Sequence, residues 1–328
     1  MADAAPPLAP PRRRHGRRES VWRWRRSDLA IFALSWIAGM GLCVITSALV
    51  AFFAVKGAQY LRPNLLVQSP SPSVSQAGSG GFLDPIEGTI LLGAIGLVIA
   101  VPLGVTTALW VLEFGRPRWL ARIVDSTVEI IAGTPDVVLA IFGLALFELG
   151  LFAPLSFGQP GGAFGRSFLT CGIIVSAVAI PSIYTATRNG LISTPRQLRE
   201  ASYALGKTKT ATIRRVVLPA IRRDIATGSA LGLGRIIGDT AIVILLLGAT
   251  LQTQTQSSTP ILGLLRGTGS TLTSYAFNAS PAGDGNAPTK AYAAAALLLV
   301  LVLVLNWCVG RIGRIGGPPL HTERRLGA

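Results

Sequence analysis

Long uncharged apolar segments constrain this chain more than any other feature. Four of them contain no Asp, Glu, Lys or Arg and cover residues 29–55, 88–112, 167–187 and 291–309. Each is near or above the roughly 20 residues that a helix needs to cross a bilayer. Two more apolar segments, 130–147 and 225–250, carry Asp136 and the pair Arg235 and Asp239. The sequence therefore predicts an all-α polytopic membrane protein with six transmembrane helices.

The positive charge is distributed unevenly along the chain. The formal net charge of +15 would suggest nucleic acid as the partner of a soluble protein. If the N-terminus is cytoplasmic, 24 Lys and Arg residues fall on the inner side and 5 on the outer side. Such an excess is the topology signal of bacterial membrane proteins. We therefore expect both termini of this multi-pass membrane protein to be cytoplasmic, and we expect no nucleic-acid partner.

The two ends of the chain differ from the region between them. Residues 1–28 are rich in Pro and Arg and predict a disordered basic cytoplasmic tail, and residues 316–328 predict a second tail. The region that holds the six predicted spans covers 29–315. Trp22 and Trp24 alternate with arginines, which suits contact with anionic membrane lipid but equally suits a simple topology signal. Cys43, Cys171 and Cys308 fall inside predicted spans, so we expect no metal site and no cofactor.

A basic hairpin, residues 194–219, separates the fourth and fifth predicted spans. Thr194, Pro195 and Gln197 have the spacing of a capped helix start, and Gly206 is placed to end that helix. A second helix is expected from about 208 to 217, with Pro219 stopping it. The apolar residues of the first helix recur at helical spacing and are Leu198, Ala201, Ala204 and Leu205.

Three interpretations of the hairpin compete. It can lie on the lipid surface as an interfacial helix pair, or it can be a lever on which a soluble partner pushes. A helix-turn-helix for DNA is disfavoured, because spans follow closely on both sides and a duplex would press against the bilayer.

The hairpin resembles the Glu-Ala-Ala loop of ABC importer permeases. The matching residues are Glu200-Ala201-Ser202, then Gly206, then Val216 and Leu218-Pro219, with Ser202 and Val216 as conservative departures. The resemblance implies the type I permease fold, and it makes 198–206 a coupling helix that sits in a cleft of an ATPase subunit. The residues implied in coupling are Leu198, Glu200, Ala201, Gly206, Leu218 and Pro219. The sequence contains no Gly-x4-Gly-Lys-Ser/Thr, so a separate subunit must hold ATP.

Arg235 and Asp239 are four residues apart and would share one face of a helix. A lone charge in the bilayer costs at least about 2.5 kcal/mol, and pairing reduces that cost. The pair can be a neutralised element that orients the helix, or it can line an anion path. We favour the path, because the planar arginine fork donates parallel hydrogen bonds to an oxyanion.

Three segments resemble phosphate importer permeases, and of their two subunit types the A-type fits better. They are 233–241, with Arg-x-x-Gly-Asp-Thr-Ala, then 131–136 and 278–292. The family acid is usually Glu where Asp239 stands, and a small residue is usual at Asp136. Asp136 can cap a kink beside Pro135, or it can add negative charge to the path.

Together these features predict a permease subunit that forms half of a phosphate path and carries out no covalent chemistry. The resemblance implies an ATP-binding cassette dimer, a homologous C-type permease and an extracytoplasmic phosphate-binding protein as partners. Two alternatives remain at this point: a permease for another oxyanion such as phosphonate or sulfate, and a secondary transporter or scaffold that needs no ATPase.

Overall fold

The computed structural model describes residues 26–70, 80–155, 158–159, 162–163, 165–248, 260–281 and 287–314. The chain divides into two compact units, one ending at Phe52 and the other beginning at Phe53. Helix α1 (Arg26–Ala58) is an uninterrupted apolar helix that forms the described part of the first unit and extends into the second. The predicted tails 1–28 and 316–328 lie outside the described residues, apart from 26–28.

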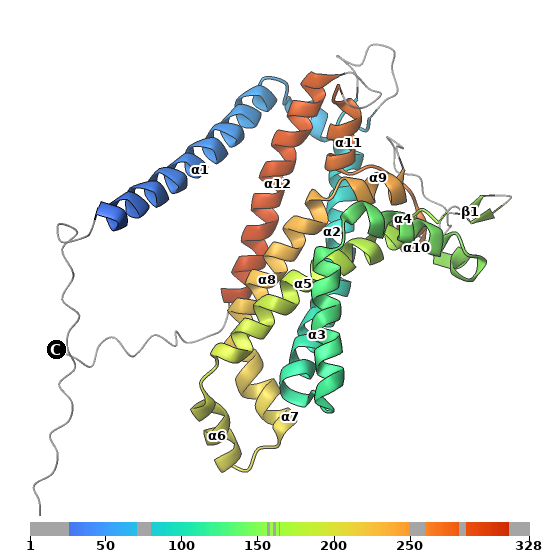
Figure 1. The fold of residues 1–328 in the computed structure, drawn as a ribbon. Helices are drawn as coiled ribbons and strands as arrows, with labels where there is room; N and C mark the ends of the chain where they lie inside the picture. The colour runs from blue at the N-terminus through green and yellow to red at the C-terminus, as the bar shows by residue number, and fades with distance from the viewer. Residues whose placement is uncertain are drawn as a thin grey trace, which may run out of the picture. The chain divides into compact units, whose positions relative to one another are not determined.

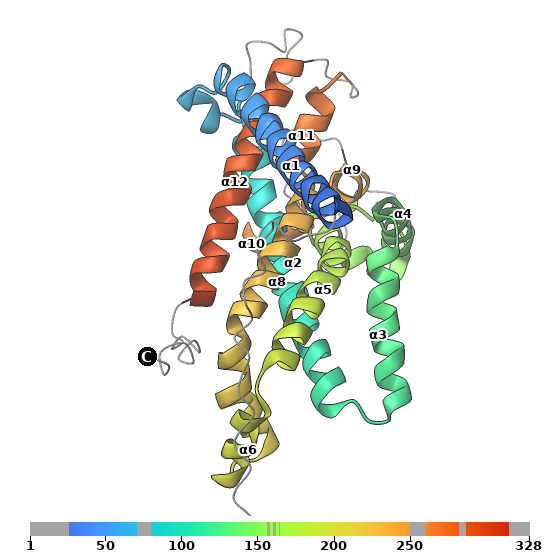
Figure 2. The ribbon, with the colours of Figure 1, turned by 60° about the vertical axis from the view of Figure 1, so that its left-hand side comes forward.

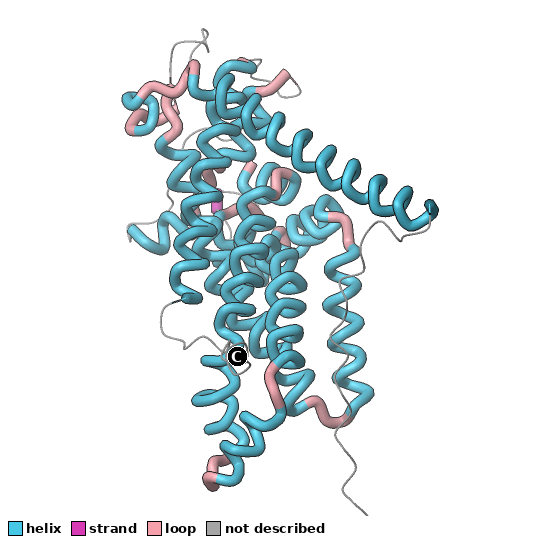
Figure 3. The backbone as a smooth tube through the Cα atoms, turned by 90° about the vertical axis from the view of Figure 1, so that its left-hand side faces the viewer, coloured by secondary structure: helices cyan, strands magenta, loops and turns pink. Residues whose placement is uncertain are grey.

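The second unit is almost entirely helical where it is described (Figures 1 and 3). Its long helices are α2 (Leu83–Leu109), α3 (Arg118–Gly133), α5 (Phe168–Ser193), α8 (Leu218–Gly238) and α12 (Pro288–Arg314). Its shorter helices are α4 (Asp136–Phe147), α6 (Arg196–Ala204), α7 (Lys209–Thr212), α9 (Ala241–Leu247), α10 (Pro260–Arg266) and α11 (Leu272–Ala279). Two π-helical segments, η3 (Trp110–Phe114) and η5 (Ile213–Val217), prolong α2 and join α7 to α8. The remaining elements are η2 (Pro63–Leu66), η4 (Gly150–Leu155) and a small antiparallel pair, β1 (Gly158–Gln159) with β2 (Gly162–Ala163).

Among the described residues, four continuous helices are long and apolar enough to cross a membrane: α1, α2 with η3, α5 and α12. Two further candidate spans are bent pairs, α3 with α4 at 105° and the helix ending at Gly238 with α9 at 59°. The predicted span 130–147 is broken between α3 and α4, as Figure 2 shows. Pro135 causes that break, because a proline disfavours helical geometry at the preceding residue, and Thr134 is extended with ψ 132°. The segment 225–250 likewise breaks after Gly238, and residues 249–250 lie outside the described part.

Prolines at the middle of two other helices have no such effect. Pro102 and Pro181 lie inside α2 and α5, and both helices run through them without ending. Neighbouring helices in a bundle support the backbone around such prolines. A proline in an apolar segment therefore does not by itself mark a helix end.

Helix α5 occupies the middle of the unit and packs against both α2 and α8. Small residues permit these close contacts. A Cβ atom built at Gly228 of α8 would lie 2.8 Å from Ala186 Cβ and 3.0 Å from Ile183 Cα of α5. The packing on both faces makes α5 the element that links the two bent pairs to α2.

We expect Gly228→Leu to separate α5 from α8 and to lower the stability of the purified protein by about 1–3 kcal/mol, as overpacking does. Thermal unfolding in detergent measures this loss. Gly234→Leu, on the same helix but with nothing within 4 Å of its Cβ position, is the matched control. Equal melting temperatures for the two variants would contradict the close α5–α8 contact.

Candidate functional site

The two helix breaks form the first candidate site. The second half-helices, α4 and α9, pack against each other and contribute to one buried cluster through Ala140 of α4 and Ile242 of α9. At one break Thr134 and Pro135 are extended, and at the other Asp239 is extended with ψ 120°. The breaks thus bring non-helical backbone and charged side chains into the apolar part of the bundle.

Arg235 in the last turn of α8 makes an ion pair across these breaks. Its Nη2 atom lies 3.5 Å from Oδ1 of Asp136, the first residue of α4. The predicted pair of Arg235 with Asp239 is not among the ion pairs of the described residues. Asp239 follows the last residue of α8, and its N–H still donates to Arg235 O at 3.1 Å, but its carboxylate bonds to the start of α9 instead. The two side chains of the observed pair are 39% and 41% exposed, so both are accessible in this chain.

Asp239 has a different local function. Its Oδ1 atom accepts a hydrogen bond from the backbone N–H of Ile242 at 2.9 Å, in the first turn of α9. A carboxylate in this position satisfies a helix N–H that has no partner within the helix. Only 9% of the residue is exposed, and Oδ2 has no hydrogen-bond partner within the described structure. Asp239 therefore fixes where α9 begins.

The basic hairpin, residues 194–219, forms a second candidate site, which is built on α6. Gly206 has φ +73° and follows the helix end, as predicted. The Gly206 N–H donates to Tyr203 O at 2.9 Å and the Lys207 N–H donates to Ser202 O at 3.2 Å. These two bonds are the Schellman arrangement, which ends a helix sharply.

Helix α6 presents most of the predicted coupling residues to solvent. Glu200, Ala201 and Gly206 are exposed, and Leu198 is half-buried. Leu205 is 78% exposed, and Tyr203 adds further apolar surface. Ser202 is buried, and its hydroxyl hydrogen-bonds with that of Thr212 at 2.9 Å, which ties α6 to α7. The exposed side of α6 is thus a mixed acidic and apolar surface.

Two details of the predicted hairpin are wrong. Thr194 does not cap α6, because its Oγ1 donates to Gly190 O at 2.9 Å and Pro195 occupies the cap position. Pro219 does not stop the second helix either. Helix α7 continues through η5 into α8, and Pro219 lies in the first turn of α8, where a missing N–H has least effect. Leu218 and Pro219 therefore lie within the long helix that leads to Arg235.

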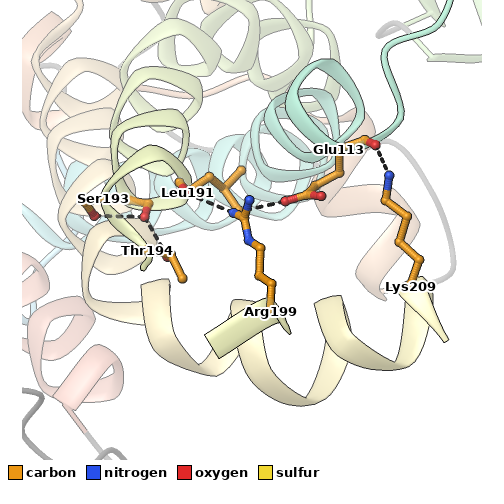
Figure 4. Close-up of polar contacts among 7 residues, drawn as sticks. Glu113, Leu191, Ser193, Thr194, Arg199 and Lys209 are labelled. Carbon is orange, nitrogen blue, oxygen red and sulfur yellow. Dashed lines mark hydrogen bonds and ion pairs between the residues drawn. The ribbon is translucent and has the colours of Figure 1, made fainter. Parts of the chain in front are cut away.

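The structure also brings together three charged residues that sequence reasoning missed. Arg199 of α6 lies 3.0 Å from Glu113 of η3, and Lys209 of α7 donates to the main-chain oxygen of Glu113 (Figure 4). Lys209 Nζ also lies 4.6 Å from the centre of the Phe114 ring. The sequence signal was present in Pro195, which has no N–H and so leaves the carbonyl of Leu191 without its usual donor.

Residues 100–314 match the family of binding-protein-dependent transport system inner membrane components. This chain belongs to that family. Its fold agrees with a solved bacterial alginate ABC transporter bound to its periplasmic protein, with a TM-score of 0.58 and 19% identity. That comparison covers 90% of this chain and 99% of the other.

Two curated relatives carry phosphate in their names. Phosphate transport system permease protein PstA 1 of Mycobacterium tuberculosis (strain CDC 1551 / Oshkosh) is 35% identical over 170 residues, which are 52% of this chain and 52% of the relative. Phosphate transport system permease protein PstC of Xylella fastidiosa (strain 9a5c) is 32% identical over 197 residues, covering 55% and 60%. The chain thus spans little more than half the length of these relatives. Family membership and the apolar helices make it a multi-pass inner-membrane transporter component rather than an enzyme.

Proposed function

We propose that this chain is a permease subunit of an ATP-driven importer of inorganic phosphate and forms half of the translocation path. The observation that carries the proposal is Arg235, an accessible cation at the point where two broken spans meet. Broken helices at membrane depth are tolerated where they are buried in protein or line a cavity. Two relatives named as phosphate transport permeases support the choice of cargo.

The chemistry of Arg235 suits this cargo. A guanidinium remains charged at any physiological pH and can donate two parallel hydrogen bonds to a tetrahedral oxyanion. The cation is balanced in this structure by Asp136 rather than by Asp239. An entering anion therefore competes with Asp136 for the same guanidinium, while Asp239 holds the start of α9 in place.

That competition gives a prediction. We expect Asp136→Asn to lower the phosphate concentration at half-maximal uptake by up to about fivefold, because a partly exposed ion pair is worth about 0.2–1 kcal/mol. Initial uptake rates over a range of phosphate concentrations measure the change. Glu129→Gln removes an exposed carboxylate from α3 and serves as the control. A weaker apparent affinity in Asp136→Asn would mean that Asp136 assists the anion instead.

The remaining assignments follow from the position of α6. Its exposed side, with Glu200, Ala201 and Leu205, fits the cleft of an ATP-binding cassette subunit, so α6 is the coupling helix and lies in the cytoplasm. Both termini are then cytoplasmic, in agreement with the distribution of Lys and Arg. One chain offers one coupling helix, whereas a dimer of ATPases presents two clefts. A second, C-type permease completes the path, this chain is the A-type subunit, and an extracytoplasmic phosphate-binding protein delivers the cargo.

Radiolabelled phosphate uptake tests the function directly. A phosphate-transport-deficient bacterium expresses this chain with its neighbouring subunits, and arsenate, sulfate and phosphonate are added as competitors. Uptake that arsenate alone inhibits supports phosphate as the cargo. If the assembled complex takes up sulfate or phosphonate instead, the importer function would stand, but phosphate would not be its cargo.

A further inference from the structure

Two helices of the bundle end beside the hairpin with a carbonyl that lacks its usual donor. In a helix each carbonyl accepts from the N–H four residues later. Leu191 lies near the end of α5, and the residue four positions later is Pro195, which has no N–H. Glu113 lies in the π-helical segment η3, which prolongs α2 and ends at Phe114, so its carbonyl also has no donor within the helix. Both helix ends need donors from elsewhere, and their negative dipole ends favour cations.

Arg199 of α6 supplies one of these donors. Its Nη2 donates to Leu191 O at 3.0 Å and lies 3.0 Å from Glu113 Oε1. One guanidinium thus bridges the ends of α5 and α2, as Figure 4 shows. The Glu113 side chain is only 9% exposed and that of Arg199 26%. The pair is therefore largely removed from solvent, and salt screens the attraction between its two charges only weakly.

Lys209 of α7 supplies the other donor. Its ammonium donates to Glu113 O and packs over the Phe114 ring. The hairpin is thereby fixed to the bundle from both of its arms. The neighbour of Arg199, Glu200, is exposed and free to meet a partner. Arg199 thus contacts the bundle, whereas the next residue of α6, Glu200, faces solvent.

We propose that the Glu113–Arg199 ion pair is the joint through which a displacement of α6 reaches α2 and α5. The inference rests on the proposed coupling of α6 to an ATPase. A push on the exposed side of α6 acts on Arg199, and Arg199 acts on both helix ends at once. Because α5 packs against α2 and α8, the displacement then reaches the breaks at Asp136 and Asp239. Arg199 and Glu113 are positioning residues, since neither lies in the anion path.

A buried ion pair is a poor device for stability alone. Replacing such a pair with apolar residues of similar volume is often neutral or stabilising. An ion pair does, however, require one geometry, whereas apolar side chains slide over each other. A joint needs this single geometry, whereas simple packing does not. The double variant Glu113→Leu/Arg199→Met should therefore fold, insert and bind the ATPase, but it should transmit the displacement of α6 to α2 and α5 poorly.

The first experiment measures uptake per ATP hydrolysed by the complete complex in proteoliposomes. In the double variant we expect this ratio to fall by at least about fivefold, the lower end of typical coupling between sites. ATPase co-purification should stay at the level of the unmodified complex. Arg214→Gln, an exposed cation of the same hairpin, and Glu129→Gln are the matched controls. A double variant with the normal ratio would overturn the proposal.

The second experiment does not depend on the cargo. Spin labels at Arg196→Cys on α6 and Leu103→Cys on α2 report the distance between these helices in a complex without its native cysteines. The unmodified pair should keep one narrow distance in the nucleotide-free and ATP–vanadate states. Glu113→Gln should broaden or shift it when nucleotide binds. An unchanged distance in Glu113→Gln would refute the joint, whereas failed phosphate uptake by the unmodified complex would refute only the cargo.

Discussion

Replacing Arg235 with alanine should reduce phosphate uptake by at least about tenfold, since hydrogen bonds to a charged group contribute about 1.5–3 kcal/mol. Asp136 then faces the path without its counter-charge and repels the anion. The complex should still assemble, because Arg235 is exposed and its removal leaves no cavity in the core. Uptake of labelled phosphate, with the amount of assembled complex determined in parallel, measures the effect.

Two further variants sharpen this experiment. Arg235→Lys keeps the charge but loses the planar fork, so we expect uptake between those of the unmodified complex and the alanine variant. Arg223→Ala removes an exposed arginine of the same helix away from the break and should leave uptake unchanged. Normal uptake by Arg235→Ala would reduce the pair with Asp136 to an element of helix orientation.

The expected Arg235–Asp239 pair shows where sequence reasoning reached its limit. Spacing of four residues places two side chains on one face, but Asp239 lies at the break after α8 and its carboxylate bonds to the first turn of α9. The Gly238-Asp239-Thr240 sequence is itself a helix-end and helix-start signal. The apolar residues on both sides of this signal favour one continuous span instead. Asp136, the actual partner, is about one hundred residues away in sequence, so only tertiary structure could bring it to Arg235.

Prolines illustrate the same limit for the fold. The apolar segments and their helical nature followed directly from composition, and the family fold was predicted from the hairpin motif. Which proline ends a helix did not follow. Pro135 breaks a span, whereas Pro102 and Pro181 lie inside continuous helices. The difference arises from neighbouring helices, which no local pattern records.

The hairpin was predicted better than the charges that fasten it. Gly206 ends α6 as its sequence position indicates, because only a glycine adopts φ +73° without strain. The local sequence does not distinguish Glu113, since a lone acid after a span is an ordinary loop residue. Its importance depends on Arg199, which reaches the Leu191 carbonyl at the end of α5 and the Glu113 carboxylate at the same time. Such a relation is visible only once α2, α5 and α6 are placed together.

Reversing the charge of Glu200 should abolish co-purification of the ATPase subunit. Glu200 is exposed on α6 beside the apolar surface of Tyr203 and Leu205, so it sits where the proposed cleft would close around the helix. A cleft that receives an acid presents donors or positive charge, and an arginine there is repelled. Like-charge contact at an interface costs several kcal/mol, which corresponds to a loss of affinity of at least about 100-fold. Glu200→Arg should therefore be inserted in the membrane at normal levels but isolated without its ATPase.

The control for this loss is Glu129→Arg, the same charge reversal at an exposed acid on α3, outside the hairpin. Its ATPase should remain bound, because α3 offers no part of the proposed docking surface. Glu200→Gln removes the charge without reversing it, so it should weaken binding less than the arginine variant. If Glu200→Arg retains its ATPase through purification, α6 is not the docking helix. The exposed apolar side chains of α6 would then be assigned to the lipid surface, where an amphipathic helix places the same residues against the acyl chains.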